Sequence, residues 1–461
     1  MKHRNTSFWD TPITRREALI RGGTGLAALG AMGLGASPTA RGDESPPNIV
    51  VIFSDDHRWD ALGVMDHPVL ETPHLDRLAA EGILFENAFC TTSLCSPSRA
   101  SFLTGLYAHT HGVQNNMTPW DNNNVTFLEP LHDAGYETAF IGKWHMPGNF
   151  PELRGLDRFV TFTADGGQGR YFDCPLIVDG RKVEPEKSYI TEVLTDYAVE
   201  FIKKKRTSPF CLYLSHKAAH YQFFPPPEVD GLYDGRELPM PPEADNWVGV
   251  TDGHFYPKPF RTLYRDYLEC LFSLDREIGR VLDTLDEENL FHNTIVVYAS
   301  DNGFLWGEHH LTDKRWAYEE SIRIPLIMRH PGVIADPGRR TGQMALSIDL
   351  APTLLDAAGV KPHDPMEGKS LLPVLKSADA PGREAWLYEY FIDYPYSIPP
   401  IRAVRTDRYK YISYDARMEP ELFDIIDDPR EMTSLMDTET GRRILPELTT
   451  LLEHFTQGDL S

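Results

Sequence analysis

The chain has 461 residues, and its 68 Asp and Glu side chains against 45 Lys and Arg give a formal net charge of −23. So acidic a chain repels nucleic acid and anionic lipid, and we expect no nucleic-acid partner. Hydrophobic residues make up 41% and charged residues 25%, which excludes a disordered or disulfide-stapled chain and indicates a large buried core.

The first forty residues have the pattern of an export signal. A twin-arginine segment, Thr14–Ile20 (TRREALI), precedes a weakly apolar, Gly- and Ala-rich run over 22–37. We assign residues 1–42 to a twin-arginine export signal and expect a periplasmic or secreted protein; the alternative is a disordered amphipathic N-terminus. No later run approaches about 18 consecutive apolar residues, so we expect no integral membrane contact.

From residue 48 onward, apolar β-rich runs alternate with amphipathic helical patterns. This alternation predicts an α/β fold with a large, mostly parallel sheet between two layers of helices. Helices are expected over 73–80 and 263–290, and the Pro-, Gly- and Asp-rich segment 222–259 indicates an inserted loop. Strands are predicted at 48–54, 137–141, 209–215 and 294–300.

The pattern changes after Leu375. Short alternating runs at 385–390, 401–406 and 409–414 predict a small antiparallel sheet. We therefore expect a main domain over residues 43–376 and a smaller C-terminal α+β subdomain over 377–461.

The five cysteines fit no metal-binding spacing, and their odd number leaves at least one unpaired. Cys90, Cys211 and Cys270 lie in apolar stretches and are expected to be small buried hydrophobic residues. Cys95 needs a different explanation.

Polar residues follow each predicted strand at its carboxyl end. In open α/β sheets this edge forms the binding site, so the side chains are expected to converge. A single Asp pair more often caps a helix and a single His is more often structural, but four strand ends together favour a functional site. The residues are Asp55, Asp56, Lys143, His145, His216, His220, Asp301 and Asn302.

Four of these residues carry hard oxygen ligands: Asp55, Asp56, Asp301 and Asn302. Such a set suits Ca²⁺ or Mg²⁺ and is poor for Zn²⁺. Three carboxylates at one site repel one another strongly without a cation. A divalent ion is therefore the simplest partner.

Cys95 precedes Pro97, which is placed to open a helix whose N-terminus favours an anion. A cysteine phosphatase needs Arg six positions after the Cys, where this chain has Ser101. A thiolate is also a soft ligand beside a hard-cation site. An oxidised side chain that carries oxygen would remove this mismatch.

Two segments resemble the signatures of type I sulfatases, in the alkaline phosphatase superfamily: Ser93–Gly105 (SLCSPSRASFLTG) and Gly135–His145 (GYETAFIGKWH). The resemblance extends from about residue 48 to 435 and implies an alkaline-phosphatase-like fold. It implies that a maturation enzyme converts Cys95 to Cα-formylglycine, whose hydrate is the nucleophile. It further implies Ca²⁺, rather than Mg²⁺, held by Asp55, Asp56, modified Cys95, Asp301 and Asn302.

The resemblance also assigns roles to basic residues. Arg99 and Lys143 would hold the formylglycine, and Lys143 and Lys314 would neutralise the sulfuryl oxygens. His220 would protonate the leaving alcohol, and His145 would take a proton from the second hydroxyl. The family often has Pro before the histidine that corresponds to His220, where this chain has Ala219.

The segment 307–321 (GEHHLTDKRWAYEES) resembles glycan sulfatases related to N-acetylglucosamine-6-sulfatase. It implies a sulfated carbohydrate substrate, with His309 as a substrate contact or else a surface loop residue. Trp247, Phe255 and Tyr256 would stack on a sugar or only anchor the inserted loop. The alternatives are a phosphodiesterase or phosphonate monoester hydrolase of the superfamily, and a non-catalytic relative that binds sulfated glycans.

Overall fold

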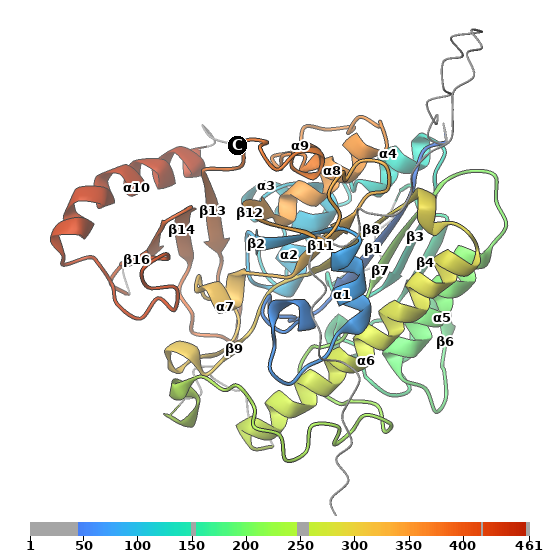
Figure 1. Ribbon diagram of the computed structural model, residues 1–461, viewed down its shortest axis with the longest axis horizontal. Coiled ribbons are helices and arrows are strands. Elements are labelled where there is room, and N and C mark those ends of the chain that lie inside the picture. Colours follow the sequence, from blue (N-terminus) through green and yellow to red (C-terminus); the bar gives the residue numbers. More distant parts are fainter. Residues whose placement is uncertain (1–44, 149–153, 247–257, 416–417, 458–461) are drawn as a thin grey trace, which may run out of the picture. The chain divides into compact units, whose positions relative to one another are not determined.

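A mixed sheet is the centre of the molecule (Figure 1), and ten strands belong to it among the described residues, in the order β12-β2-β11-β8-β1-β7-β3-β4-β5-β6. The computed structural model describes residues 45–148, 154–246, 258–415 and 418–457. The export-signal segment and Trp247, Phe255 and Tyr256 lie outside the described residues.

The middle of the sheet is parallel. Its strands β1 (Asn48–Ser54), β7 (Phe210–Ser215), β8 (Thr294–Ser300) and β3 (Glu137–Gly142) pair in parallel, with Ile52 opposite both Leu214 and Tyr298. Every residue of β1, β7 and β8 is buried, because helices cover both faces of the sheet. These near-continuous apolar runs are why the sequence predicts them well.

The flanks complete the sheet. On one side lie β11 (Leu326–Arg329), antiparallel to its neighbours, β2 (Ile83–Phe89) and β12 (Arg339–Leu346). On the other lie β4 (Arg158–Thr161), β5 (Leu176–Val178) and β6 (Arg181–Val183), the last two in antiparallel pairing. The prediction of a large, mostly parallel sheet is confirmed.

Two layers of helices enclose this sheet. One core joins it to α1 (Pro73–Ala80), α5 (Ile190–Lys203) and α6 (Phe260–Glu287), the long helix that crosses the front in Figure 1. The opposite core includes α2 (Cys95–Thr104), α4 (Leu128–Asp133), α8 (Leu350–Ala357) and α9 (Leu372–Lys376). The long helix begins and ends three residues earlier than the predicted 263–290.

Short elements connect these layers. The helices are α3 (Ala108–His111) and α7 (Glu319–Ile322), and a two-stranded sheet pairs β9 (Leu305–Trp306) with β10 (Thr312–Asp313). The 3₁₀ turns are η1 (Gly63–Met65), η2 (Ala164–Gly167), η3 (Pro242–Asn246), η4 (Phe291–Asn293), η5 (Glu308–His310) and η6 (Ser347–Asp349).

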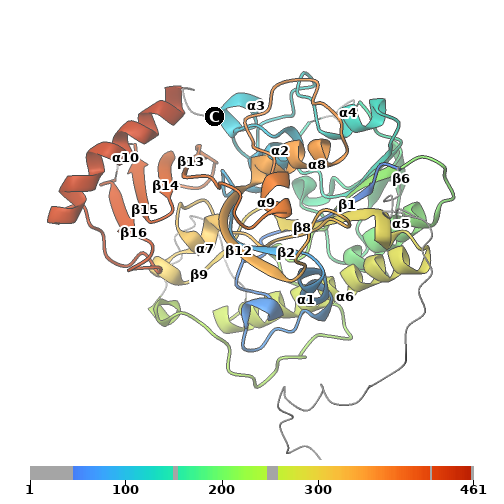
Figure 2. The same cartoon turned by 45° about the horizontal axis from the view of Figure 1, so that its top comes forward.

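The C-terminal part holds the expected antiparallel sheet, and Figure 2 shows α10 (Glu439–Gln457) beside it. Its strands β13 (Ala385–Tyr390), β14 (Ile401–Thr406) and β15 (Tyr409–Tyr414) have the predicted bounds, and β16 (Glu421–Asp424) adds an edge. Its core continues into that of the large sheet, because Trp386 stacks on Phe89 with ring centroids 5.0 Å apart.

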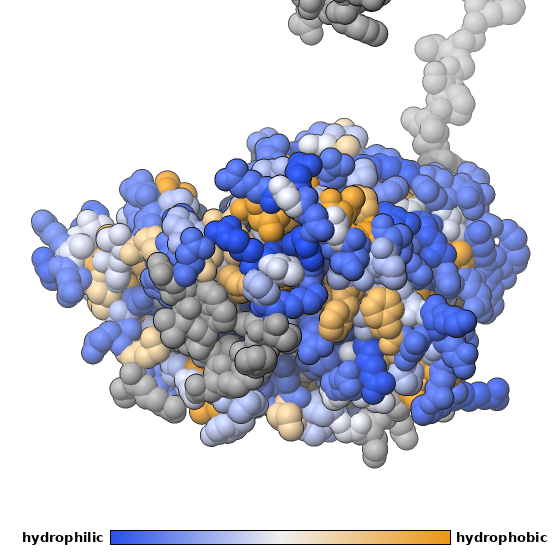
Figure 3. Space-filling model, turned by 90° about the horizontal axis from the view of Figure 1, so that it is seen from below, coloured by the Kyte–Doolittle hydropathy of each residue, from blue (hydrophilic) through white to orange (hydrophobic). Residues whose placement is uncertain are grey.

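The surface is mostly polar. Seen from below, the described surface is mainly hydrophilic, with small separate apolar areas (Figure 3). Across the described part of the chain, we find no helix with the length and apolar character needed to cross a membrane. Cys90, Cys211 and Cys270 are fully buried, as expected.

Candidate active site

The carboxyl ends of four adjacent strands form the site. The strands β8, β1, β7 and β3 are consecutive in the sheet, so the segments that follow them meet at one edge. A fifth contribution comes from α2, which begins at Cys95. A sixth is Lys314, directly after β10. The strand ends thus converge as the sequence predicted, and α2 and Lys314 join them there.

Three carboxylates form the acidic part of the site. One oxygen each from Asp55, Asp56 and Asp301 lies within 4.8 Å of the others, and all three residues are fully buried. Burial, with the charges of Asp55 and Asp301, raises the pKa of Asp56 to about 7. The local field thus opposes full ionisation of the cluster without a cation.

Two oxygens of this cluster are suited to a metal ion. Asp56 Oδ2 and Asn302 Oδ1 are buried acceptors with no hydrogen-bond partner among the described residues. Their neighbours are satisfied, since Asp301 Oδ1 accepts from Asp56 N at 3.0 Å and Asn302 Nδ2 donates to Asp56 Oδ1 at 2.7 Å. Buried unpaired oxygens beside carboxylates fit a hard divalent cation.

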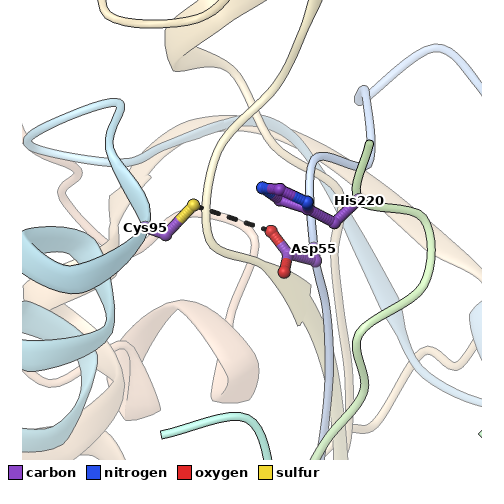
Figure 4. Close-up of side chains that lie close together, drawn as sticks. All are labelled: Asp55, Cys95 and His220. Carbon is purple, nitrogen blue, oxygen red and sulfur yellow. Dashed lines mark hydrogen bonds between the residues drawn. The ribbon is translucent and has the colours of Figure 1, made fainter. Parts of the chain in front are cut away.

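Cys95 faces this acidic cluster. Figure 4 shows its side chain directed at Asp55, with His220 alongside; the Sγ lies 3.8 Å from Asp55 Oδ1. Burial raises the pKa of the Cys95 thiol to about 12, although Lys143 and Lys314 oppose the shift. An unmodified thiol here is therefore protonated and a poor nucleophile.

Arg99, one turn after Cys95 in α2, bonds to groups at the ends of three strands. Its Nη2 and Nε lie 2.8 and 3.0 Å from Asp301 Oδ2. Its Nη1 donates to Ser215 Oγ at 2.6 Å and to the Lys143 carbonyl at 3.2 Å. The guanidinium is 2% exposed, so it joins α2 to the ends of β3, β7 and β8 in a dry environment.

Two buried ammonium groups lie at the site, one against Cys95 and one against Asp55. Lys314 Nζ contacts Asp56 and lies 3.1 Å from Cys95 Sγ, while Lys143 Nζ contacts Asp55. Burial opposes the charge of Lys314, but Asp56 and Cys95 hold its pKa well above the usual value. Together with Arg99 they make the surroundings of Cys95 suitable for an anionic group.

Two of the three predicted histidines contact polar groups of the site. His145 Nδ1 is 3.2 Å from Ser96 Oγ, and His220 Nε2 is 3.9 Å from Asp56 Oδ2. Burial, followed by the charge of Lys143, holds the pKa of both rings well below the usual value. His216 is fully buried with no partner among the described residues for either ring nitrogen.

His309 is placed apart from this cluster. Its ring stacks on Tyr318 with centroids 3.7 Å apart, and its Nε2 lies 3.7 Å from Glu320 Oε2. No contact within the described segments joins it to the acidic cluster, so its role as a substrate contact stays a prediction.

One contact lies outside the predicted set. Gln168 Oε1 accepts a hydrogen bond from Lys143 Nζ at 2.7 Å. The only sequence signal for it is the run Gly166-Gly167-Gln168-Gly169, because clustered glycines mark places where a backbone must turn sharply or approach closely.

Comparisons with known proteins agree with this geometry. The sulfatase family model matches residues 47–360, and the model for the C-terminal region of N-sulphoglucosamine sulphohydrolase matches 307–458. An N-acetylglucosamine-6-O-sulfatase of Bacteroides thetaiotaomicron is 31% identical over 93% of this chain and 89% of its own. An arylsulfatase of Clostridium perfringens is 27% identical over 89% of this chain and 95% of its own.

Solved structures of similar proteins also resemble this chain. A protein in complex with its substrate D-glucosamine-2-N,6-O-disulfate is similar with a TM-score of 0.83 and 30% identity, covering 90% of this chain and 98% of that one. A putative sulfatase of Bacteroides fragilis has a TM-score of 0.73 and 26% identity, covering 90% and 97%.

The fold and the site define a hydrolase of the alkaline phosphatase superfamily, with its polar residues at the carboxyl edge of a large α/β sheet. Within that class the chain belongs to the sulfatase family, and it is a sulfuric ester hydrolase. The expected resemblance to N-acetylglucosamine-6-sulfatases is confirmed.

Proposed function

We propose that this protein removes sulfate from a sulfated carbohydrate. The observation that carries the proposal is the pair of buried lysines beside Cys95 and Asp55 at the carboxyl edge of the sheet: Lys314 contacts Cys95 and Lys143 contacts Asp55. The glucosamine-directed relatives support a sulfated amino sugar as the substrate class.

The site requires two groups that the chain itself does not encode. We propose that Cys95 is oxidised to Cα-formylglycine by a maturation enzyme, and that Asp55, Asp56, Asp301, Asn302 and residue 95 hold Ca²⁺, in preference to Mg²⁺. When present, the hydrated aldehyde supplies an oxygen nucleophile and the ion supplies positive charge that favours its ionised form. The unpaired Asp56 Oδ2 and Asn302 Oδ1 support this ligand set.

The cationic side chains stabilise charge on the sulfuryl group. Lys314 Nζ lies 3.1 Å from Cys95 Sγ and Lys143 Nζ contacts Asp55, which itself faces Cys95; both lysines are buried, so their charges act in a medium of low dielectric constant. Arg99 donates hydrogen bonds to the carbonyl of Lys143 and the carboxylate of Asp301. It therefore holds the segments that follow β3 and β8 in position near residue 95.

The two histidines move protons. His220 Nδ1 contacts the Tyr221 carbonyl, which leaves Nε2 directed at the site, where it protonates the departing alcohol oxygen. Burial and Lys143 lower the pKa of His220, so the ring must take up a proton from solvent, which an anionic substrate beside it favours, before it can donate; its imidazolium form is then a strong acid. His145, held at Nδ1 by Ser96 Oγ, accepts the proton that must leave residue 95 before sulfate is released.

Three further parts of the proposal concern the rest of the chain. His309 contacts the sugar, and residues 1–42 direct export by the twin-arginine route to the periplasm or outside. The main domain ends after α9, at Lys376, and the C-terminal subdomain of residues 377–461 begins before β13.

The first test compares substrates. Purified protein is assayed for sulfate release from glucosamine-6-sulfate and its N-sulfated and N-acetylated forms, against an aryl sulfate and an aryl phosphate diester, with and without chelator. Sulfate release that chelator abolishes supports the proposal. Preference for the phosphodiester would instead favour a phosphodiesterase or phosphonate monoester hydrolase, and binding without turnover would favour a non-catalytic glycan binder.

The second test concerns residue 95. Mass spectrometry of the tryptic peptide that ends at Arg99 should show the mass of an aldehyde in place of the thiol, and Cys95→Ala should be inactive. Full activity of Cys95→Ala, or an unmodified thiol in active protein, would refute the proposed nucleophile.

A further inference from the structure

Gln168 lies beside the catalytic residues, yet neither the sequence signatures nor the ligand set includes it. Its Oε1 accepts from Lys143 Nζ at 2.7 Å, and it is half-buried, whereas Lys143 is fully buried. Lys143 has one other side-chain partner in the described structure, Asp55. Gln168 is therefore one of two groups that hold this ammonium in place.

The contact fixes the direction of the Gln168 amide. A lysine ammonium only donates hydrogen bonds, so the carbonyl oxygen of the amide must face it. The NH₂ group then points away from Lys143, and it has no acceptor in the described part of the protein. An amide donor with two free N–H groups thus lies next to Lys143, whose other partner, Asp55, has an oxygen 3.8 Å from Cys95 Sγ.

The backbone around Gln168 is built to bring it there. In the turn formed by η2 and the residues after it, Gly166, Gly167 and Gly169 have φ values of 69°, 90° and 74°. A Cβ at Gly169 would lie 2.6 Å from the Phe162 ring, and one at Gly167 would lie 3.3 Å from both Cα and Cδ2 of His145. The turn therefore packs against His145 and Lys143 at once.

We infer that Gln168 is a further substrate-binding residue: it positions Lys143 through its oxygen and donates a hydrogen bond from its Nε2 to a sulfuryl oxygen. This inference rests on the proposed sulfate site. A neutral amide suits the role, because it adds a donor beside Lys143 without a further charge to desolvate. A carboxylate in its place would still accept from Lys143 but would repel the sulfate.

Two substitutions separate positioning from donation. Gln168→Met keeps the length of the side chain and removes both polar groups, while Gln168→Glu keeps the acceptor for Lys143 and removes the donor. If Gln168 Nε2 donates a hydrogen bond to the sulfate, we expect Gln168→Met to bind inorganic sulfate about 10-fold more weakly than wild type, the equivalent of one hydrogen bond. We expect a larger loss of sulfate affinity in Gln168→Glu, because the carboxylate also repels the anion.

Sulfate affinity is measured by calorimetry and by thermal stabilisation in wild type and variants, and as product inhibition where turnover is found. Gln343→Met is the matched control, since Gln343 Nε2 donates to the Ala380 carbonyl at 2.6 Å, a bond between β12 and a surface loop. Its sulfate affinity should equal that of wild type.

The outcomes are distinct. Sulfate affinity in Gln168→Glu equal to or above that of wild type would show that Gln168 only positions Lys143 and would overturn the donor role. No change in Gln168→Met would overturn both roles. If wild type binds sulfate and Gln168→Met binds it more weakly, but no sulfated sugar is hydrolysed, the proposed function fails while the assignment of Gln168 stands.

Discussion

At the scale of single residues, Arg99 is the buried charge on which most of the site depends. Replacement by Lys removes the planar fork that reaches Asp301, Ser215 and the Lys143 carbonyl together. We expect Arg99→Lys to lose activity and about 2–4 kcal/mol of the free energy of unfolding, because a single ammonium cannot satisfy all of these buried acceptors. Urea unfolding followed by circular dichroism measures this loss.

Arg77→Lys is the matched control for that experiment. Arg77 pairs with Glu81, Asp283 and Asp286, but its side chain is 32% exposed, so solvent screens these pairs. We expect a change of no more than about 1 kcal/mol. Equal losses in the two variants would show that burial does not set the contribution of Arg99.

Asp275 provides a pH-dependent test away from the site. It accepts from the backbone N–H groups of Leu75 and His74 at the start of α1, and burial raises its pKa to about 7. The folded protein therefore binds a proton that the unfolded chain releases near pH 4, so Asp275 costs stability as the pH rises from about 4 to 7.

The comparison with Asp275→Asn isolates this effect. Between pH 5 and 8 we expect the variant to gain about 2–3 kcal/mol relative to wild type, which corresponds to the part of the pKa shift titrated in that window. Thermal or urea unfolding at several pH values measures the difference. A constant difference across this range would contradict the raised pKa.

At the scale of elements, the sequence predicts best where burial is uniform. The central strands β1 and β8 match the predicted bounds, because β-rich runs buried on both faces are continuous in sequence. Their neighbours β7 and β3 differ from the prediction by one residue at one end. The convergence of their carboxyl ends follows from parallel pairing alone.

The position of Lys314 could not be predicted from the periodicity of the sequence. Between Gly307 and Arg315 the backbone has positive φ at His309, His310, Asp313 and Arg315, so no helical or strand period is present to read. The β9–β10 pair and the approach of Lys314 to Cys95 depend on contacts across the chain, such as Arg315 N to the Ser93 carbonyl at 3.1 Å. Only the family resemblance pointed to Lys314.

Gly142, the last residue of β3, packs closely against the end of β7. Gly142 has φ of 120°, and a Cβ there would lie 1.8 Å from the Ser215 carbonyl oxygen, the acceptor for Lys143 N at 2.7 Å. We expect Gly142→Ala to lose about 3 kcal/mol or more and to displace Lys143, with a fall in activity, since overpacking and left-handed strain add.

Gly112→Ala is the control for the strain alone. Gly112 has φ of 79°, but a Cβ there would meet nothing within 4 Å. We expect a loss of about 1 kcal/mol with activity retained. A similar loss in both variants, measured by urea unfolding, would mean that contact with Ser215 is not what requires glycine at position 142.

At the scale of the whole molecule, the net charge of −23 and an anionic substrate are compatible because charge is distributed unevenly. The cations Arg99, Lys143 and Lys314 are buried at the site, where they pair with Asp55, Asp56 and Asp301, whereas many carboxylates elsewhere are exposed in surface ion pairs. The acidic exterior disfavours nucleic acid, while Arg99, Lys143 and Lys314 place buried positive charge at the site of the sulfate ester.

This distribution leaves the three buried carboxylates as an electrostatic cost to the whole fold, which a divalent cation would remove. We expect chelator to lower the midpoint of thermal unfolding and Ca²⁺ to restore it, because a ligand that binds only the folded state stabilises it by about 2.7 kcal/mol at one hundred times its Kd. Asp301→Asn should reduce the response to Ca²⁺, while Asp283→Asn, at an exposed residue of α6, should keep it. An unfolding midpoint that neither chelator nor Ca²⁺ moves in wild type would show that Asp55, Asp56 and Asp301 are balanced by Arg99, Lys143 and Lys314 alone.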